Sequence, residues 1–218
     1  TGQKTFLKSA FTNKNFKFFR CDILNLNRLK KIFKNSNIVF HFAANADVRF
    51  GYKHPYKDLE QNTIGTYNVL EAMRKNNINN IVFCSTGSIY GEPKKFPTPE
   101  QAEFPLQTSF YGASKLAGES LIQVYCESFG FKSWIFRFVS ILGNRYTHGH
   151  VYDFCKQLFN NSNYLKVLGN GNQRKSYLHV NDCINAILIS LKKSKIPKKI
   201  LHTLLKPYIF QLTIIIYL

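Results

Sequence analysis

Residues 80–91 read Asn-Ile-Val-Phe-Cys-Ser-Thr-Gly-Ser-Ile-Tyr-Gly, and this stretch decides the fold class. Its first five residues form an apolar, β-prone run, which predicts a strand. The run leads directly into Ser85 and Thr86. A Pro-rich loop follows, and a helix is predicted over residues 114–129. A strand followed by a loop and a helix is the repeating unit of α/β proteins.

A second motif, Tyr111-Gly112-Ala113-Ser114-Lys115, lies at the start of that helix. Residues four apart share a helix face, so Tyr111 and Lys115 can meet. Because an ammonium beside a phenol favours the phenolate, we expect Lys115 to lower the pKa of Tyr111 toward that of a usable general base. Thr86 adds a hydroxyl that can bind the same substrate oxygen. A hydroxyl-bearing substrate and a hydride acceptor suit such a site. The alternative is an ordinary exposed helix face with one tyrosine tucked against the body.

The rest of the chain also alternates strands and helices. Strands are predicted at 16–21, 38–42, 133–138 and 165–168, and helices at 27–33, 55–76, 151–159 and from 181 or 182 to 191. We expect the strand at 38–42, which is almost continuously apolar, to be buried on both faces. This order predicts a doubly wound parallel sheet, in which ligands bind outside the carboxyl ends of the strands. Asp22, Ala43, Ala44, Thr86 and Gly143 all fall at that edge, which indicates one shared site.

Composition narrows the class of protein. The 218 residues suffice for one domain, or for one and part of a second, and the 44% apolar fraction can bury a core. No 18-residue apolar run indicates a membrane span, and no secretory signal is visible. The net charge of +18 comes from scattered lysines without a nucleic-acid motif, so we expect no nucleic-acid partner. The five cysteines lack metal-ligand spacing, which favours reduced, buried thiols in a cytoplasmic protein and no metal site.

Many ordered motifs give the chain a family resemblance. They are Cys21-Asp22-Ile23, His41-Phe42-Ala43-Ala44, the segment 62–72, the Thr86 segment, Tyr111 with Lys115, Arg137-Phe138, Gly143-Asn144-Arg145 and the segment 169–182. Together they resemble an extended short-chain dehydrogenase/reductase of the NAD-dependent sugar-nucleotide epimerase/dehydratase family. This resemblance implies a Rossmann-like fold, NAD as cofactor and a nucleotide-sugar substrate. A homodimer through the two helices that include the Tyr/Lys helix is expected by analogy.

The resemblance also implies roles for individual residues. Tyr111 would be the catalytic base and acid, Lys115 would hold the nicotinamide ribose, and Thr86 would hydrogen-bond the reacting sugar hydroxyl. For the cofactor, the expected neighbours of the adenine are Asp22 and Ile23, and the residues lining the dinucleotide are Ala43 and Ala44. For the substrate, the expected residues are Thr86, Ser140 and Lys175, with Lys175 near the diphosphate where relatives usually carry Arg.

Several of these residues have simpler interpretations. Asp22 could end a strand or cap a turn, and His41 is expected to be a satisfied core histidine. Asn62 is expected to be structural rather than catalytic. Arg49 could reach substrate or simply face solvent, and His148 and His150 could line the sugar pocket or lie in an exposed loop.

The residues after Thr86 narrow the reaction. The 4,6-dehydratases that this chain resembles carry Asp-Glu there, and relatives that decarboxylate a uronic acid place Glu at the second position, whereas this chain has Gly87 and Ser88. Without an extra proton-transfer group, the simplest chemistry is reversible oxidation at C4 of the sugar. We therefore predict epimerisation of the UDP-glucose/UDP-galactose type. The alternatives are another reductase or dehydratase of the family, or a catalytically silent fragment of such an enzyme.

Both ends of the sequence depart from the family pattern. The resemblance implies a first strand and a Gly-x-x-Gly-x-x-Gly turn, but no such motif occurs in the 218 residues. We therefore expect an N-terminally truncated chain that binds NAD weakly or not at all. Residues 1–145 would form a partial NAD-binding domain, 146–199 a partial substrate lobe with a returning Rossmann segment, and 200–218 an atypical tail. The β-prone run at 213–217 is either an aggregation-prone exposed segment or a strand that packs on the sheet.

Overall fold

The computed structural model describes residues 3–95, 97–100, 102–103, 106–172 and 175–193, together with the backbone of 213–217. Four strands form the main sheet in the order β1-β2-β3-β6. They are β1 (Ile38–His41), β2 (Asn80–Thr86), β3 (Lys132–Phe138) and β6 (Thr213–Tyr217). The first three are parallel, and β6 pairs antiparallel with β3. The predicted α/β fold with a parallel sheet is therefore confirmed, with one antiparallel strand added.

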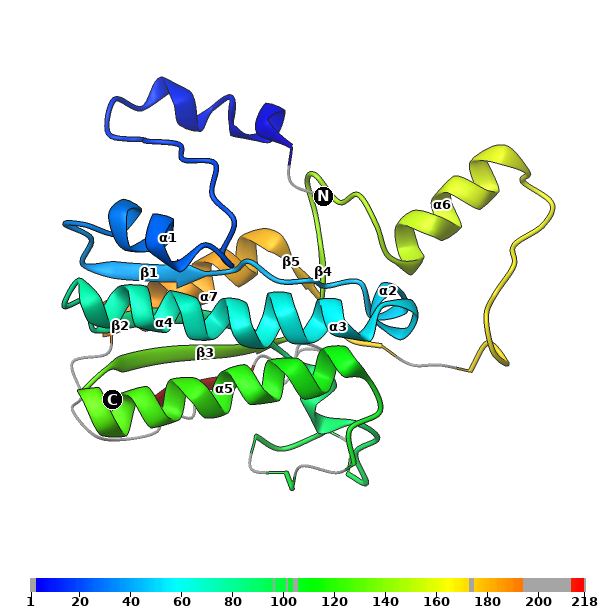
Figure 1. Cartoon of the computed structure of the whole chain (residues 1–218). Helices are drawn as coiled ribbons and strands as arrows, with labels where there is room; N and C mark the ends of the chain where they lie inside the picture. Colours follow the sequence, from blue (N-terminus) through cyan, green and yellow to red (C-terminus); the bar gives the residue numbers. More distant parts are fainter. Residues whose placement is uncertain are drawn as a thin grey trace.

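Alternate side chains of the central strands enter two separate cores. Ile81, Phe83 and Ile135 pack in one core with residues of two helices, α4 (Gly65–Lys75) and α5 (Phe110–Phe129). On the opposite face, Val82, Trp134 and Phe136 pack in a second core with residues of α7 (Val180–Lys193). Figure 1 shows α4 and α5 on one side of the sheet and α7 on the other. Burial on both faces explains why the middle of each strand, 81–84 in β2 and 134–136 in β3, is a continuous apolar run.

The remaining elements connect these layers. They are the 3₁₀ turns Lys4–Leu7, Ala10–Thr12 and η4 (Gly87–Tyr90), the helices α1 (Leu26–Ile32), α2 (Val48–Lys53) and α3 (Pro55–Asp58), and the π-helical turn η3 (Leu59–Ile64). The helix predicted over 55–76 is thus one continuous rod of α3, η3 and α4 with a π turn inside it. Such single π turns often occur at functional sites.

A second, smaller sheet follows β3. Strands β4 (Ser140–Leu142) and β5 (Tyr177–His179) pair in parallel, and α7 begins directly after β5. Between them, α6 (His150–Asn160) has no buried residue and extends away from the main sheet (Figure 1). The helix predicted over 151–159 is confirmed.

Two predicted strands do not form. Residues 16–21 and 165–168 have no strand assignment. An isolated apolar run becomes a strand only when a neighbour satisfies its backbone groups, and no described strand lies beside either segment. Val167 and Leu168 are accordingly exposed, at 43% and 69%.

Three other predictions are corrected. Strand β1 is not buried on both faces, because it lies at an edge of the main sheet and its Phe40 is 44% exposed. Helix α7 starts at Val180, so neither Asn181 nor Asp182 precedes it as a cap; instead the His179 ring accepts the Asn181 N–H. All five cysteines are free, but only Cys126 and Cys183 are buried; Cys21 and Cys84 are half-buried and Cys155 is exposed. For the run at 213–217, the strand alternative is the correct one.

Candidate active site

The carboxyl end of β2 places Thr86 at the centre of the site. Thr86 is 8% exposed, and its hydroxyl accepts the Ser88 N–H at 3.1 Å, which caps η4. The same hydroxyl lies 3.2 Å from the Ser88 hydroxyl and beside the phenol of Tyr111, whose pKa it lowers. The Thr86 segment at the end of β2 and the Tyr111 motif therefore lie side by side, as predicted.

The start of α5 brings Tyr111 to that position. Ser109 caps the helix by accepting the Gly112 N–H at 3.0 Å. A Cβ at Gly112 would lie 2.9 Å from the carbonyl oxygen of Ser88, so the glycine allows α5 to approach η4 closely. Helix α5 therefore begins at Phe110, four residues before the predicted start, and Tyr111 belongs to its first turn.

Lys115 lies one turn further along α5 and is only 3% exposed. Its Nζ atom sits 4.3 Å from the centroid of the Phe83 ring, in cation–π contact. Burial lowers the pKa of Lys115, while the charges of Cys84 and Glu119 raise it. The ammonium is thus held inside the protein, between β2 and the helix.

The pKa of Tyr111 is raised to about 12, chiefly because burial disfavours the phenolate. The charges of Cys84 and Asp58 also raise it, and the hydrogen bond from Thr86 lowers it. Lys115 is not among the groups that shift it. The pKa of Tyr111 is therefore raised in this structure, not lowered as predicted, because burial of the phenol is the largest effect on it.

His41, at the end of β1, is a satisfied core residue, as expected. It is 3% exposed, and its Nε2 lies 2.9 Å from the Thr66 hydroxyl. That hydroxyl donates to the Asn62 carbonyl at 2.6 Å, so His41 is the donor in its own contact. Burial, and then the charge of Lys115, lower the pKa of His41 to about 3. The imidazole is therefore neutral and adds no positive charge beside Lys115.

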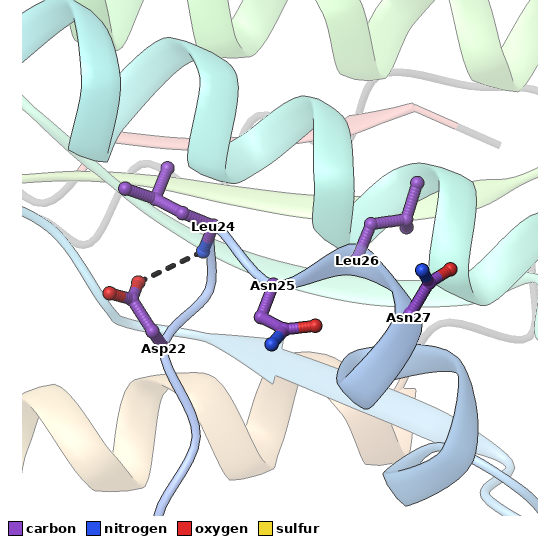
Figure 2. A pocket seen from close by; sticks show the side chains of 5 residues that line it. All are labelled: Asp22, Leu24, Asn25, Leu26 and Asn27. Atoms are coloured by element: carbon purple, nitrogen blue, oxygen red, sulfur yellow. Dashed lines mark hydrogen bonds between the residues drawn. The ribbon is translucent and has the colours of Figure 1, made fainter.

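The expected cofactor residues lie along the same edge of the sheet. Residues 22 and 24–27 line an open hollow, in which the Asp22 carboxylate accepts the Leu24 N–H at 2.9 Å (Figure 2). The side chain of Ile23 turns away from it: its Cδ1 atom would lie 2.4 Å from a Cβ at Gly65 on α4. Ala43 is exposed and Ala44 half-buried in the loop after β1.

Two of the expected substrate residues belong to the small sheet or adjoin it: Ser140 lies on β4, and Lys175 lies two residues before β5. Ser140 begins β4 two residues beyond Phe138, which pairs with Thr86, so it follows the carboxyl end of β3. It pairs with Tyr177, and Lys175 is exposed just before that residue. The charge of Lys175 helps to lower the pKa of His150, after the larger effect of burial, and His150 hydrogen-bonds the Tyr177 hydroxyl. No described contact joins Ser140 or Lys175 to Thr86 or Tyr111.

A buried ion pair links α5 to the main sheet beside Thr86. Glu119 of α5 and Arg137 of β3 are 0% and 2% exposed, and their charged atoms are 2.7 Å apart. The Ser85 hydroxyl donates to Glu119, and Arg137 donates to the Tyr90 hydroxyl at 2.6 Å. The pair therefore ties α5 to both central strands beside Thr86. The sequence pattern points to Arg137 only as part of a family motif and does not show that Arg137 pairs with Glu119.

Sequence reasoning also missed two groups that act on Tyr111. Cys84 is half-buried on β2, and Asp58 is 1% exposed at the end of α3. Each raises the pKa of the phenol. The only available signal for Asp58 was its spacing of four residues from Asn62 on one helix.

The described residues contain no group of three or more His, Cys, Asp or Glu side chains that could hold a metal ion. Among the described helices, none has both the length and the apolar character of a membrane span.

Comparison with known proteins identifies the family. The family model for the "NAD dependent epimerase/dehydratase family" matches residues 3–201. The chain belongs to this family. A putative UDP-glucose 4-epimerase of Methanocaldococcus jannaschii is 35% identical to this family member over 186 residues, which cover 82% of this chain and 60% of the relative. The chain therefore spans less than two thirds of the length of that relative.

Solved structures of the family agree with the fold. A UDP-galactose 4-epimerase has a TM-score of 0.78 and 35% identity, over 88% of this epimerase/dehydratase family member and 61% of that chain. A UDP-glucuronic acid 4-epimerase of Bacillus cereus, solved with UDP-glucuronic acid and NAD, has a TM-score of 0.76 and 28% identity, over 87% and 60%. The family thus uses NAD, and these homologues act on nucleotide sugars.

Proposed function

We propose that the chain carries the site of an NAD-dependent 4-epimerase for a nucleotide sugar of the UDP-glucose/UDP-galactose type. The observation that carries the proposal is that Thr86 lies beside Tyr111, close enough to lower the pKa of its phenol, with a buried Lys115 one turn further along α5. The positions after Thr86 hold Gly87 and Ser88, whose side chains supply no carboxyl group for elimination or decarboxylation. Oxidation and reduction at one carbon need only the hydroxyl groups present.

Each residue has a defined task in this proposal. Thr86 hydrogen-bonds the 4-hydroxyl of the sugar, and Tyr111 as phenolate takes its proton while the C4–H bond breaks. Bound NAD supplies the acceptor and then the donor of the hydride. Tyr111 returns the proton to the keto oxygen when hydride arrives on the opposite face of C4. Lys115 contributes positive charge beside the reacting atoms.

The side chains present fit the two ends of the cofactor. The open hollow at 22–27 and the small Ala43 and Ala44 leave room for the adenine half along the sheet edge. Tyr111 and Lys115 would hold the nicotinamide ribose. Because the sequence contains no Gly-x-x-Gly-x-x-Gly turn, these residues supply no helix N-terminus for the pyrophosphate.

The substrate half of the proposal rests on the small sheet. Ser140 would contact the sugar, and the exposed Lys175 would attract the diphosphate as a point charge. Residues 1–145 would then serve NAD, and 146–199 would serve the substrate before returning to the sheet through α7. A homodimer through α4 and α5 remains part of this proposal.

A second function class, a catalytically silent fragment, is favoured by the missing glycine turn. The two classes differ in NAD binding. Isothermal titration of the chain with NAD and with a UDP-sugar separates them: binding of both ligands supports the epimerase site, and no heat with NAD supports the silent fragment. A reductase of the same family would bind both ligands but would consume a reduced cofactor stoichiometrically.

Substitution of Tyr111 tests the role of the phenol. Tyr111→Phe removes the only group proposed to move the 4-hydroxyl proton, so we expect turnover of UDP-galactose to fall by about 10²–10⁴-fold. Binding of the UDP-sugar should persist. Tyr164→Phe is the matched control, because that side chain is 64% exposed and lies outside the site. Near-normal turnover in Tyr111→Phe would remove Tyr111 from the mechanism.

A further inference from the structure

Asp58 is a buried carboxyl group with an incomplete set of hydrogen bonds. It ends α3 and is 1% exposed. Its Oδ1 atom accepts from the side-chain amides of Asn45 and Asn62, at 2.8 and 3.2 Å. Within the part of the chain that the structure describes, its Oδ2 atom has no hydrogen-bond partner. Buried polar atoms without partners are rare and costly, so this one calls for a reason.

The backbone of α2 closes the space around that oxygen. A Cβ at Gly51 would lie 1.9 Å from Asp58 Oδ2, and Gly51 is itself buried. A larger residue at 51 would have to displace the carboxyl group. The glycine therefore lets α2 lie directly against Asp58, and the oxygen faces the protein backbone rather than solvent.

The hydrogen-bond partners of Asp58 connect it to the loop after β1 and to α5. Asn45 lies in the loop after β1, directly after the small Ala43 and Ala44. Its main chain is fixed by Asn62, whose Oδ1 accepts the Asn45 N–H at 2.8 Å and whose Nδ2 donates to the Asn45 carbonyl at 3.1 Å. Asp58 and Asn62 thus hold both the side chain and the backbone of Asn45.

Asn62 connects Asp58 to α5, the helix that carries Tyr111. Nδ2 of Asn62 also lies 2.9 Å from the Ser114 hydroxyl, and that hydroxyl donates to the Tyr111 carbonyl at 3.0 Å. With two hydrogens for three acceptors, this nitrogen shares at least one hydrogen between two of them. Asn62 belongs to the π turn η3, and it is 1% exposed. The side chain of Asn62 on the π turn therefore contacts the loop, Asp58 and α5 together.

We propose that Asp58 is a positioning residue, which holds the loop 43–47 and the Tyr111 end of α5 in a fixed relation through Asn45 and Asn62. The inference rests on the proposed function only in that it takes this loop and Tyr111 to be parts of one site. Asp58 touches neither substrate nor cofactor in this role. It acts through the two amides.

The hydrogen bonds of Asp58 also bear on its pKa. A buried carboxylate is stabilised by several donors, whereas this group has two amide donors on one oxygen and, within the described residues, none on the other. Burial raises the pKa of Asp58, the two amides lower it, and the charge of Asp47 before α2 raises it further. From α5, Tyr111 is the titratable group that faces it, and the charge of Asp58 raises the pKa of the phenol.

The test uses Asp58→Asn and Asp58→Ala in the full 218-residue chain. Asparagine keeps the acceptor at Oδ1 and mimics the neutral acid, whereas alanine removes the acceptor. We expect hydrogen exchange of the Asn45 amide to speed up about tenfold or more in Asp58→Ala and to stay near wild type in Asp58→Asn. Asp182→Asn is the matched control, because Asp182 is exposed on α7. If Asp58→Ala does not fold, Asn45→Ala removes one amide donor at a half-buried site and should loosen the same loop.

The pH dependence of unfolding gives the second readout. Because the pKa of Asp58 is raised above the ordinary 3.8, its contribution to stability is complete below that value and is lost as the pH rises through the folded-state pKa. Asp58→Asn should lack this loss. Fast exchange at Asn45 in Asp58→Asn, unchanged exchange in Asp58→Ala, or the same pH dependence in wild type and Asp58→Asn would overturn the proposal. Neither readout needs NAD or sugar, so a failure of turnover alone rejects the proposed function and leaves this inference standing.

Discussion

The Tyr111 phenol is the residue on which the proposed chemistry depends, and its surroundings favour the acid form. Burial, Cys84 and Asp58 all raise its pKa, and only the Thr86 hydrogen bond lowers it. A phenol with a pKa of about 12 is protonated at neutral pH. It is therefore ready to return a proton, and it becomes a base only when positive charge is added next to it. The positive nicotinamide ring of bound NAD is a group that can supply such charge.

A titration of the chain tests this property. The difference in tyrosinate absorbance between wild type and Tyr111→Phe should show one group with a pKa of about 12. Because burial is the largest effect on the pKa of the phenol and Lys115 is not among the groups that shift it, Lys115→Met should leave that midpoint nearly unchanged in the chain without NAD. Addition of NAD should move the midpoint down. A midpoint below the ordinary tyrosine value in the chain alone would contradict the account.

The sequence predicts Thr86, Tyr111 and Lys115 because each belongs to a short motif at a strand end or on one helix face. It also predicts His41 as a core residue. It does not predict the direction of the Tyr111 pKa, because that depends on burial and on groups from other elements. Asp58 and Cys84 were missed for the same reason, since their contacts are made only in the folded chain.

At the scale of elements, apolar pattern and spacing predict those helices and strands that find partners. Strands β2 and β3 are buried on both faces and were predicted closely. The runs at 16–21 and 165–168 have the same local pattern but no described neighbour, so they stay outside the sheets. The π turn at η3 gives no signal in the hydrophobic pattern. The apolar pattern of one segment does not show which other segment will form hydrogen bonds with its backbone.

The attachment of α5 to the sheet gives a prediction at this scale. Arg137→Met would leave Glu119 buried without its charge partner, so we expect the free energy of unfolding to fall by about 3–5 kcal/mol. Lys57→Met is the control, because it breaks the exposed Lys57–Glu60 pair and should change stability little. Denaturant unfolding of both variants measures the difference. Equal losses in the two would show that the buried pair does not anchor α5.

At the scale of the whole molecule, three layers bring one edge of a parallel sheet together with one helix start. The two cores on opposite faces of β2 and β3 hold that edge in place. The loops after β1, β2 and β3 all begin at this edge. The family membership follows from this arrangement and from the match over residues 3–201. The chain spans about 60% of the relative from Methanocaldococcus jannaschii, so the activity of the whole enzyme remains a proposal for these 218 residues.

The most direct test of the central claim is the conversion of UDP-galactose by the chain in heavy water, with excess NAD, followed by proton NMR. Transient oxidation at C4 predicts that UDP-glucose appears, that its C4 hydrogen comes from the substrate rather than the solvent, and that Tyr111→Phe forms none. Excess NAD is needed because the sequence lacks the glycine turn for the pyrophosphate. No UDP-glucose from the wild-type chain, or solvent deuterium at C4 of the product, would contradict the account.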